Sequence, residues 1–273
     1  MASSEFRTPD SRSSGNPESV DLDRALLVAR DAAATAGRIA MNYFRRPLDV
    51  ETKDDASPVT VADRECERAI RERIASAFPD HAIHGEEYGR TGRHRCLWLI
   101  DPIDGTRSFI RGLEFWSVQI ALMVDGELVL GVSAAPPFDE TAWALRDAGA
   151  WLDGTRLTVA PDRDIDGMDL SLGNVRSLAR GEAWPRVGEL VVRAARTRGY
   201  GDFYPYHRLA AGGLDAVIES DVNILDIAAL TVIVREAGGV VTALDGGPVD
   251  LETGSILAAT PALHAALLSF LDD

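Results

Sequence analysis

Residues 98–106 read Trp-Leu-Ile-Asp-Pro-Ile-Asp-Gly-Thr, an apolar run that ends abruptly in two carboxylates three positions apart. The run from Cys96 to Ile100 predicts a short buried strand, which the chain leaves at Asp101. Pro102 has no amide hydrogen and a fixed φ, so we expect the backbone to turn there instead of continuing in the sheet. The pattern therefore predicts a core strand with polar side chains gathered at its end.

This strand end offers oxygen ligands and a site for an anion. After such a turn Asp101 and Asp104 can face one point, and the carbonyl of Ile103, free of any ladder, can face it too. Hard divalent cations such as Mg²⁺ favour such all-oxygen surroundings. Gly105 lets the backbone approach a ligand, and the amides after it can hold an anion if a helix begins there. Because Asp-x-x-Asp-Gly is also an ordinary turn sequence, the rest of the chain has to decide.

Length, charge and cysteine content restrict the classes of protein. The 273 residues can bury a large core as one broad domain or two closely joined halves. A net charge of −15 argues against nucleic acid or an anionic membrane as the main partner, but not against a phosphorylated substrate accompanied by metal ions. Cys66 and Cys96 lack a CxxC spacing and are expected to be reduced, structural thiols. Residues 1–18 are predicted to be a disordered tail without signal-peptide character, and no apolar run approaches membrane-spanning length, so we expect a cytoplasmic protein.

Helices and strands are mixed along the chain without a strict βαβ rhythm, which favours layered sheets and helices over a doubly wound fold. Residues 162–198 give mixed signals. We expect a first helix capped by Asp21 or Asp23 and ending before Pro47. Further helices are predicted over 62–77, 204–212, 261–271 and a segment opened by Asp226 as N-cap and stopped by Gly238-Gly239, and strands over 82–84, 116–122, 128–134, 142–145, 216–219, 240–244 and 256–259.

Acidic residues recur where the predicted elements begin or end. Glu86 follows the strand over 82–84, and Asp226 opens a helix. Together with Asp101 and Asp104 they supply four carboxylates from three segments, enough to hold two or more divalent ions. Each has a simpler interpretation by itself, Glu86 as a solvated turn residue and Asp226 as a helix cap.

In the order and spacing of these motifs, the chain resembles the inositol monophosphatase superfamily of Mg²⁺-dependent, Li⁺-sensitive phosphatases. The resemblance runs from about residue 22 onward and implies an α+β fold, a layered αβαβα sandwich. It implies one phosphatase domain over 19–273, with an N-terminal α+β half to about 155 and a C-terminal α/β half, and a homodimer. The matching segments are Pro-Val-Thr-Val-Ala-Asp (58–63), Gly-Glu-Glu (85–87), Asp-Pro-Ile-Asp-Gly-Thr (101–106), Asp-Ile-Ala-Ala (226–229) and Glu-Ala-Gly-Gly (236–239).

The resemblance also implies roles for single residues. Asp63 and Thr106 match the pair that orients the attacking water, and the amides of Gly105 and Thr106 match the phosphate cradle. Lys53 falls in the loop that closes over the metals. The positions that match the ligands of two or three Mg²⁺ ions are Glu86, Asp101, the Ile103 carbonyl, Asp104 and Asp226.

The implied reaction is hydrolysis of a phosphomonoester by metal-activated water. Phosphate monoesters resist hydrolysis mainly because their anionic oxygens repel the nucleophile, and clustered Mg²⁺ offsets that charge and stabilises the leaving alkoxide. The competing class is a non-catalytic acidic binding protein. Intact Asp63 and Thr106 argue against it, because a pure metal binder has no use for a pair that activates water.

The substrate is predicted from two further segments. Tyr-Gly-Asp-Phe (200–203), and residues 104–112 followed by Phe115-Trp116, resemble the histidinol-phosphate phosphatase branch, which implies L-histidinol phosphate and a place in histidine biosynthesis. Asp202 would pair with the cationic amine, and Glu219 matches the acceptor of a substrate hydroxyl. Inositol monophosphate and another small sugar or nucleotide phosphate stay open as substrates. So does a cap role for Asp202. Leu225 stands where many family members carry Trp, which changes the expected pocket wall.

Overall fold

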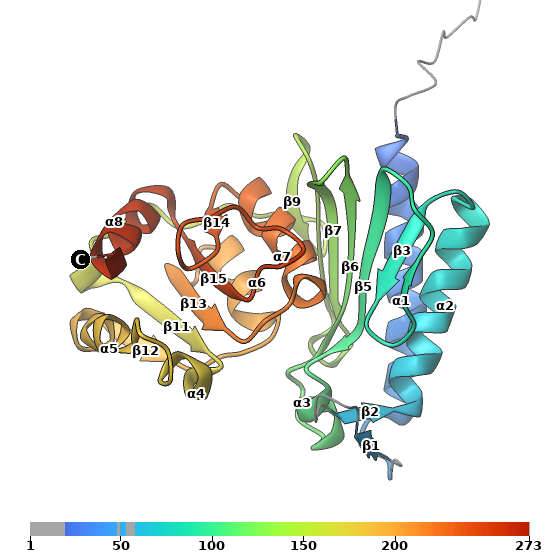
Figure 1. Cartoon of the computed structure of the whole chain (residues 1–273), viewed down its shortest axis with the longest axis horizontal. Coiled ribbons are helices and arrows are strands. Elements are labelled where there is room, and N and C mark those ends of the chain that lie inside the picture. The colour runs from blue at the N-terminus through green and yellow to red at the C-terminus, as the bar shows by residue number, and fades with distance from the viewer. Residues whose placement is uncertain (1–19, 48–49, 53–57, 273) are drawn as a thin grey trace, which may run out of the picture.

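The computed structural model describes residues 20–47, 50–52 and 58–272. Our predictions for the N-terminal tail and for Lys53 concern residues outside these ranges. Figure 1 shows five layers, in the order helices, sheet, helices, sheet, helices, as the αβαβα prediction requires. The helices of the three helical layers are α1 (Leu22–Tyr43) and α2 (Val61–Ala77), then α6 (Tyr204–Ala210) and α7 (Ile224–Glu236), then α4 (Val175–Leu178), α5 (Trp184–Arg193) and α8 (Pro261–Asp272).

The outer helices α1 and α2 cover one face of the larger sheet. Helix α1 begins after Asp21, whose carboxylate accepts a 3.0 Å hydrogen bond from the amide of Arg24, so Asp21 is the cap among the two candidates. On α2, Cys66, Ile70 and Ile74 are fully buried on the face toward the sheet, as their helical spacing predicts. No helix in the described ranges is long and apolar enough to cross a membrane.

The larger sheet has eight strands in the order β10-β9-β8-β7-β6-β5-β3-β4. All its pairs are antiparallel except β3 with β5, where Gly85 lies opposite Ile100. This parallel pair sets the end of β3 beside the end of β5, so the acidic residues that follow the two strands come together. The bounds are β3 (Ala82–Gly85), β4 (Gly89–Thr91), β5 (Cys96–Asp104), β6 (Ser117–Val124), β7 (Glu127–Ala135), β8 (Glu140–Leu145), β9 (Gly149–Leu152) and β10 (Thr155–Arg156).

The prediction that the chain leaves the sheet at Asp101 is wrong. Strand β5 continues to Asp104, and both aspartates still pair with β6, with a register shift between them. A bulge of this kind accommodates a proline that cannot donate to the ladder, so Pro102 interrupts the pairing without ending the strand. The expectation for Ile103 holds, because no ladder partner is recorded for it inside the irregularity.

The smaller sheet has five strands in the order β12-β11-β13-β15-β14. Helix α7 lies between the two sheets, and ten of its residues are buried, which explains why its sequence is apolar on all sides. The ambiguous segment 162–198 forms β11, α4, α5 and β12. The strand bounds are β11 (Asp169–Gly173), β12 (Arg196–Arg198), β13 (Ala216–Ser220), β14 (Val240–Thr242) and β15 (Ser255–Ala259), and a separate pair is formed by β1 (Val50–Thr52) and β2 (Pro58–Thr60).

Candidate active site

Three aspartates meet where β5 ends and α7 begins. One carboxylate oxygen from each of Asp101, Asp104 and Asp226 lies within 4.8 Å of the other two. Asp101 and Asp104 are buried, and Asp226 is partly exposed. We call these three residues the aspartate cluster. It concentrates negative charge at one end of the core.

The position of Asp226 follows from the start of α7. Asn223 is the N-cap, and Asp226 is the third helical residue, so the prediction that Asp226 itself caps the helix is wrong. The amide of Asn223 donates to Asp226 Oδ2 at 2.8 Å, and the Asn223 side chain donates to Oδ1 at 2.9 Å. This is a capping box, and its sequence signal, Asn-x-x-Asp before an apolar run, was present but missed. This capping box fixes the position of the Asp226 carboxylate in the cluster.

The electrostatics of the cluster favour a bound cation. Burial, followed by repulsion from Glu86, raises the pKa of Asp101 well above its ordinary value, and burial and Asp202 do the same for Asp104. Burial raises the pKa of Asp226 to about 6. Among the described residues, no basic side chain forms an ion pair with the three aspartates. Buried oxygen ligands without a basic partner fit a hard divalent ion such as Mg²⁺.

Glu86 joins this group from the end of β3. Its amide donates to the carbonyl of Ile100 at 3.3 Å, which places residue 86 beside the start of the bulge in β5. Its negative charge contributes to the raised pKa values of Asp63, Asp101 and Asp226. The structure therefore brings together all four carboxylates that the sequence proposed as ligands.

Asp63 and Thr106 lie in contact on the α2 side of the cluster. The Thr106 hydroxyl is 3.3 Å from Asp63 Oδ1 and 3.0 Å from the carbonyl of Ile103. Asp63 is fully buried, and Thr60 donates to its Oδ2 from both its amide, at 2.8 Å, and its hydroxyl, at 2.6 Å. Thr60 is the N-cap of α2 and holds Asp63 in place, a role that was not predicted from the sequence.

Gly105 follows Asp104 of the aspartate cluster in the chain and lies against Asp202. A short helix, α3 (Thr106–Ile110), begins after Gly105, as anticipated. Gly105 has φ of +87°, and a Cβ there would lie 2.6 Å from the carbonyl of Phe115 and 3.2 Å from Asp202 Oδ2. Only glycine fits this close approach, and the Asp202 carboxylate consequently lies directly against the backbone of the predicted phosphate cradle.

Asp202 does not cap a helix, so that alternative is wrong. Helix α6 has Phe203 as its N-cap and no side-chain hydrogen bond at the cap, and Asp202 has φ of +55°. Burial, with repulsion from Asp226, raises the pKa of Asp202 to about 6. Since Asp202 is held close to other carboxylates without a structural hydrogen bond at the helix, it is available to a ligand.

A cavity of about 40 Å³ adjoins the cluster. Glu219 lies in its wall and accepts a hydrogen bond from the Tyr206 hydroxyl at 2.9 Å, while burial raises the pKa of Glu219 to about 8. Leu225, the departure from the family pattern, does not line the cavity and is buried in the core. The sequence analysis missed Tyr206 and Asn174. The lining residues are Asp104, Asn174, Asp202, Tyr206, Glu219, Val222, Asp226, Ile227 and Leu230.

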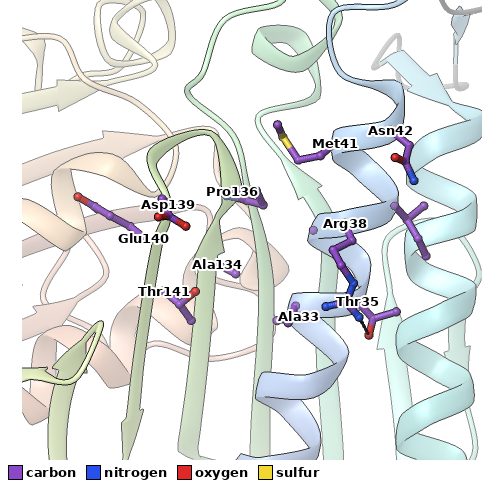
Figure 2. Close-up of a pocket in the computed structure, with 13 residues that line it drawn as sticks. Ala33, Thr35, Arg38, Met41, Asn42, Ala134, Pro136, Asp139, Glu140 and Thr141 are labelled. Atoms are coloured by element: carbon purple, nitrogen blue, oxygen red, sulfur yellow. Dashed lines mark hydrogen bonds between the residues drawn. The ribbon is translucent and has the colours of Figure 1, made fainter.

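Two other features lie away from this chemistry. His207 is fully buried, with Nε2 2.9 Å from the Ser133 hydroxyl, and packs in the core. A larger hollow of about 790 Å³ lies between α1 and the turn after β7 (Figure 2). Its wall is formed mainly by alanine, threonine and other small or polar residues, and it includes none of the predicted site residues.

Comparison with known proteins supports the same interpretation. The sequence profile of the inositol monophosphatase family matches residues 21–272. The chain is 39% identical to the histidinol-phosphatase of Mycobacterium tuberculosis, over 92% of this chain and 98% of the relative. It is 36% identical to the histidinol-phosphatase of Streptomyces coelicolor, over 94% of this chain and 98% of the relative. The inositol monophosphatase structure from Anabaena (Nostoc) matches with a TM-score of 0.82 and 28% identity, over 93% of this chain and 97% of that one.

The profile match covers nearly the whole described chain, and the two relatives are matched over almost their full length. The family is metal-dependent, and the aspartate cluster provides oxygen ligands suited to a metal ion. The layered fold agrees with the solved structure. The chain therefore belongs to the inositol monophosphatase family and is a metal-dependent phosphomonoesterase.

Proposed function

We propose that this protein hydrolyses L-histidinol phosphate to L-histidinol and phosphate in the aspartate-cluster site. The observation that carries the proposal is the position of Asp202, whose carboxylate lies against Gly105 while the residue caps no helix. Histidinol phosphate has an ammonium group close to its phosphate, and a buried carboxylate beside the phosphate cradle suits that spacing. The similarity to two histidinol-phosphatases points in the same direction.

The metal ligands in this proposal are the four acidic residues and one carbonyl predicted from the sequence. When bound, Mg²⁺ supplies positive charge that offsets the phosphate oxygens and makes water a stronger nucleophile. Two or three ions would share the donors. These donors are Glu86, Asp101, the Ile103 carbonyl, Asp104 and Asp226.

Asp63 and Thr106 orient the attacking water in this mechanism. When the Thr106 hydroxyl donates its proton to Asp63, its oxygen is left to accept a hydrogen bond from the water. Thr60 holds the other oxygen of Asp63, so the pair is fixed before substrate binds. The amides of Gly105 and Thr106 bind phosphate oxygens while the water oxygen forms a bond to phosphorus. The ester P–O bond breaks, and the proton that the water loses is transferred to the leaving alkoxide, which departs as the alcohol.

Asp202 and Glu219 bind the remainder of the substrate. Asp202 accepts charge-assisted hydrogen bonds from the ammonium group, which inositol lacks. Glu219, oriented by Tyr206, faces the same cavity. This arrangement favours a cationic phosphate ester over a neutral one, because the ammonium group offers Asp202 a charge-assisted hydrogen bond that a neutral substrate cannot offer.

Phosphate release from two substrates tests the assignment. Histidinol phosphate and inositol monophosphate are compared at equal concentrations with Mg²⁺, and a parallel series contains excess chelator. We expect a kcat/KM for histidinol phosphate at least tenfold above that for inositol monophosphate, and no activity in chelator. A preference for inositol monophosphate would overturn the substrate assignment while leaving the phosphatase class intact.

Inositol monophosphate is the second candidate, because the family profile and the Anabaena structure carry that name and Glu219 can accept a ring hydroxyl. Another small sugar or nucleotide phosphate would fit less well beside Asp202. We also propose a cytoplasmic homodimer with a single domain over 19–273. The two buried free thiols, Cys66 and Cys96, support a reducing compartment. Light scattering with size-exclusion chromatography tests the dimer.

A further inference from the structure

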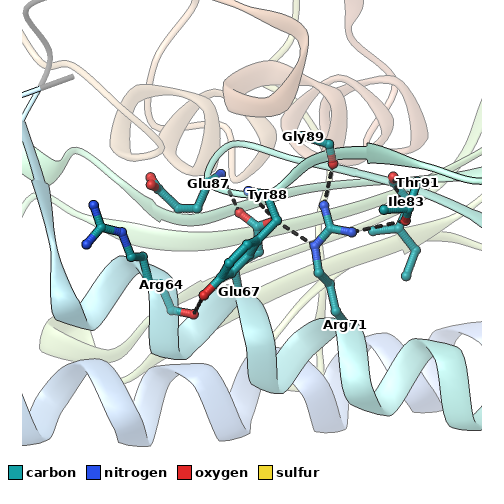
Figure 3. Close-up of polar contacts among 8 residues, drawn as sticks. All are labelled: Arg64, Glu67, Arg71, Ile83, Glu87, Tyr88, Gly89 and Thr91. Atoms are coloured by element: carbon teal, nitrogen blue, oxygen red, sulfur yellow. Dashed lines mark hydrogen bonds and ion pairs between the residues drawn. The ribbon is translucent and has the colours of Figure 1, made fainter. Parts of the chain in front are cut away.

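Another buried carboxylate, Glu67, lies outside the aspartate cluster. It is on α2 and its side chain is completely buried. Figure 3 shows it pointing from the helix toward the turn between β3 and β4, where residues 86–88 connect the two strands. A buried carboxylate needs hydrogen bonds or a basic partner to be tolerated, and Glu67 has both.

The Glu67 carboxylate binds the backbone of this turn at two successive residues. The amide of Glu87 donates to Oε2 at 2.6 Å, and the amide of Tyr88 donates to Oε1 at 3.2 Å. Gly85 lies directly beneath the carboxylate, where a side chain on that residue would collide with it. The backbone of the turn therefore rests on Glu67, and the Tyr88 hydroxyl adds a side-chain hydrogen bond to the carbonyl of Arg64 at 3.4 Å.

Arg71 completes this arrangement one helical turn later. Its Nε donates to Glu67 Oε1 at 2.7 Å, so the buried charge is neutralised within α2. Its other nitrogens donate to the Thr91 hydroxyl at 3.2 Å and to the carbonyl of Gly89. The guanidinium thus links the helix to β4 as well as to the carboxylate.

Glu86 is the residue between the two fixed points. Its own amide is bonded to Ile100 of β5, and the next amide along the chain is bonded to Glu67. Residues 90–95, which follow the turn, are exposed. With the peptide fixed on both sides, the backbone of Glu86 loses little conformational entropy when its side chain binds a ligand.

We propose that Glu67 and Arg71 are positioning residues that fix Glu86 as a ligand for the metal. The inference rests on the proposed function, since it takes Glu86 to be a ligand. Glu67 does not enter the metal site itself, because its oxygens are already engaged by Arg71 and by two amides. Partners that orient metal ligands in this way typically change metal affinity by about 10–100-fold when removed.

Glu67→Gln tests the proposal with little change in shape. A glutamine has one oxygen and one NH₂ group, so in either orientation the NH₂ group faces an N–H donor. The better orientation keeps the oxygen toward Arg71 and Tyr88, which leaves the amide of Glu87 without an acceptor. Arg71→Lys is the second variant, because it keeps a positive charge but cannot make all three bonds.

Arg73→Gln is the matched control. It lies on the same helix and breaks a 2.7 Å ion pair with Asp31, which is far more exposed than the pair of Glu67 and Arg71. Exposed pairs of this kind contribute little to stability. Circular dichroism and thermal unfolding in chelator establish that each variant folds cooperatively.

Titration calorimetry with Mg²⁺ provides the deciding measurement, independent of any substrate. We expect at least a tenfold weaker Mg²⁺ affinity in Glu67→Gln, a smaller loss in Arg71→Lys and none in Arg73→Gln. Raising the Mg²⁺ concentration should restore most of kcat, which a merely structural defect would not allow. Unchanged Mg²⁺ affinity in folded Glu67→Gln and Arg71→Lys, or an equal loss in Arg73→Gln, would overturn the proposal. Absence of phosphatase activity in the unmodified protein would instead count against the proposed function.

Discussion

Two acidic groups of this protein, Glu67 with its partner Arg71 and the aspartate cluster, differ in how their negative charge is compensated. Glu67 receives a guanidinium and two backbone amides from within its own surroundings. The aspartate cluster receives hydrogen bonds from neutral groups such as Asn223 and Ser117 but, among the described residues, no basic partner. The difference teaches that burial alone does not identify a metal site. The distinguishing property is a buried charge that the protein has left uncompensated.

The two groups also differ in how far apart their members lie in the sequence. Glu67 and Arg71 are four residues apart on one helix, so their pairing forms with α2 itself. The aspartate cluster joins β5 to α7 and exists only when α7 has packed on the larger sheet. Removing the charge of Glu67 therefore tests a local support of the site. Removing a charge from the aspartate cluster tests the metal site itself.

Loss of metal should have the largest effect on activity. Excess chelator should abolish phosphate release, and Asp101→Asn should lower kcat at least about a hundredfold because it removes a charge from the ligand set. The measurement is phosphate release across a Mg²⁺ titration. Full activity in excess chelator would show that the reaction needs no metal ion at the aspartate cluster, and the cluster would then not differ from Glu67 as a metal site.

Thr106→Ala should have the next largest effect. We expect kcat to fall by about a hundredfold while Mg²⁺ affinity stays within about twofold, because the hydroxyl orients water rather than binding the metal. Steady-state kinetics paired with Mg²⁺ calorimetry checks this split. If metal affinity fell in step with kcat, Thr106 would belong to the metal site.

Asp202→Asn should act on one substrate only. Charge-assisted pairing contributes on the order of 1.5–3 kcal/mol, so kcat/KM for histidinol phosphate should fall roughly ten- to a hundredfold. Inositol monophosphate, which has no ammonium group, is the matched control and should change little. Equal losses on both substrates would show that Asp202 supports the fold.

The stability of the metal-free protein should depend on pH in the direction set by the uncompensated charges. In the folded state the pKa is about 6 for Asp202 and Asp226 and about 8 for Glu219, above the ordinary 3.8 and 4.5. Between pH 4 and 8 the folded protein therefore holds protons that the unfolded chain has released, and stability falls as pH rises.

Thermal unfolding in chelator measures this effect. We expect Tm to fall by several degrees between pH 5 and pH 8.5, and Mg²⁺ to restore much of the loss at the higher pH. Glu219→Gln should flatten the part of the curve above pH 6.5. A Tm that is flat across this range in chelator would contradict the idea that these carboxylates lack compensation.

Much of the fold was predictable because local patterns agree with it. The helix predicted over 62–77 agrees with α2, and one of the two caps proposed for the first helix, Asp21, is the cap in the structure. The strand exit at Pro102 was wrong, since local proline chemistry does not reveal that a neighbouring strand can accommodate a bulge. The segment 162–198 was ambiguous because its short elements obtain stability from a sheet assembled with distant strands.

The site was predictable in its residues but not in its supports. Motifs in three segments named the four carboxylates, and the structure brings them together. Glu67 and Tyr206 were missed because each acts through a contact with a distant segment, which leaves no signal in its neighbours. Asn223 was missed although its capping pattern is local. Long-range contacts and overlooked caps account for most of what sequence reasoning did not find.

The place of α7 between the two sheets has a mechanical consequence. Asp226 is in its first turn, while Asp101 and Asp104 are on the larger sheet, so a cation bound by all three would join the helix to the sheet. Small sliding motions between these layers would lengthen the metal–ligand bonds and be opposed by them. The metal concentration would then control the amplitude of the relative motion between these layers. The width of the cavity beside the cluster would depend on ion occupancy as well as on substrate.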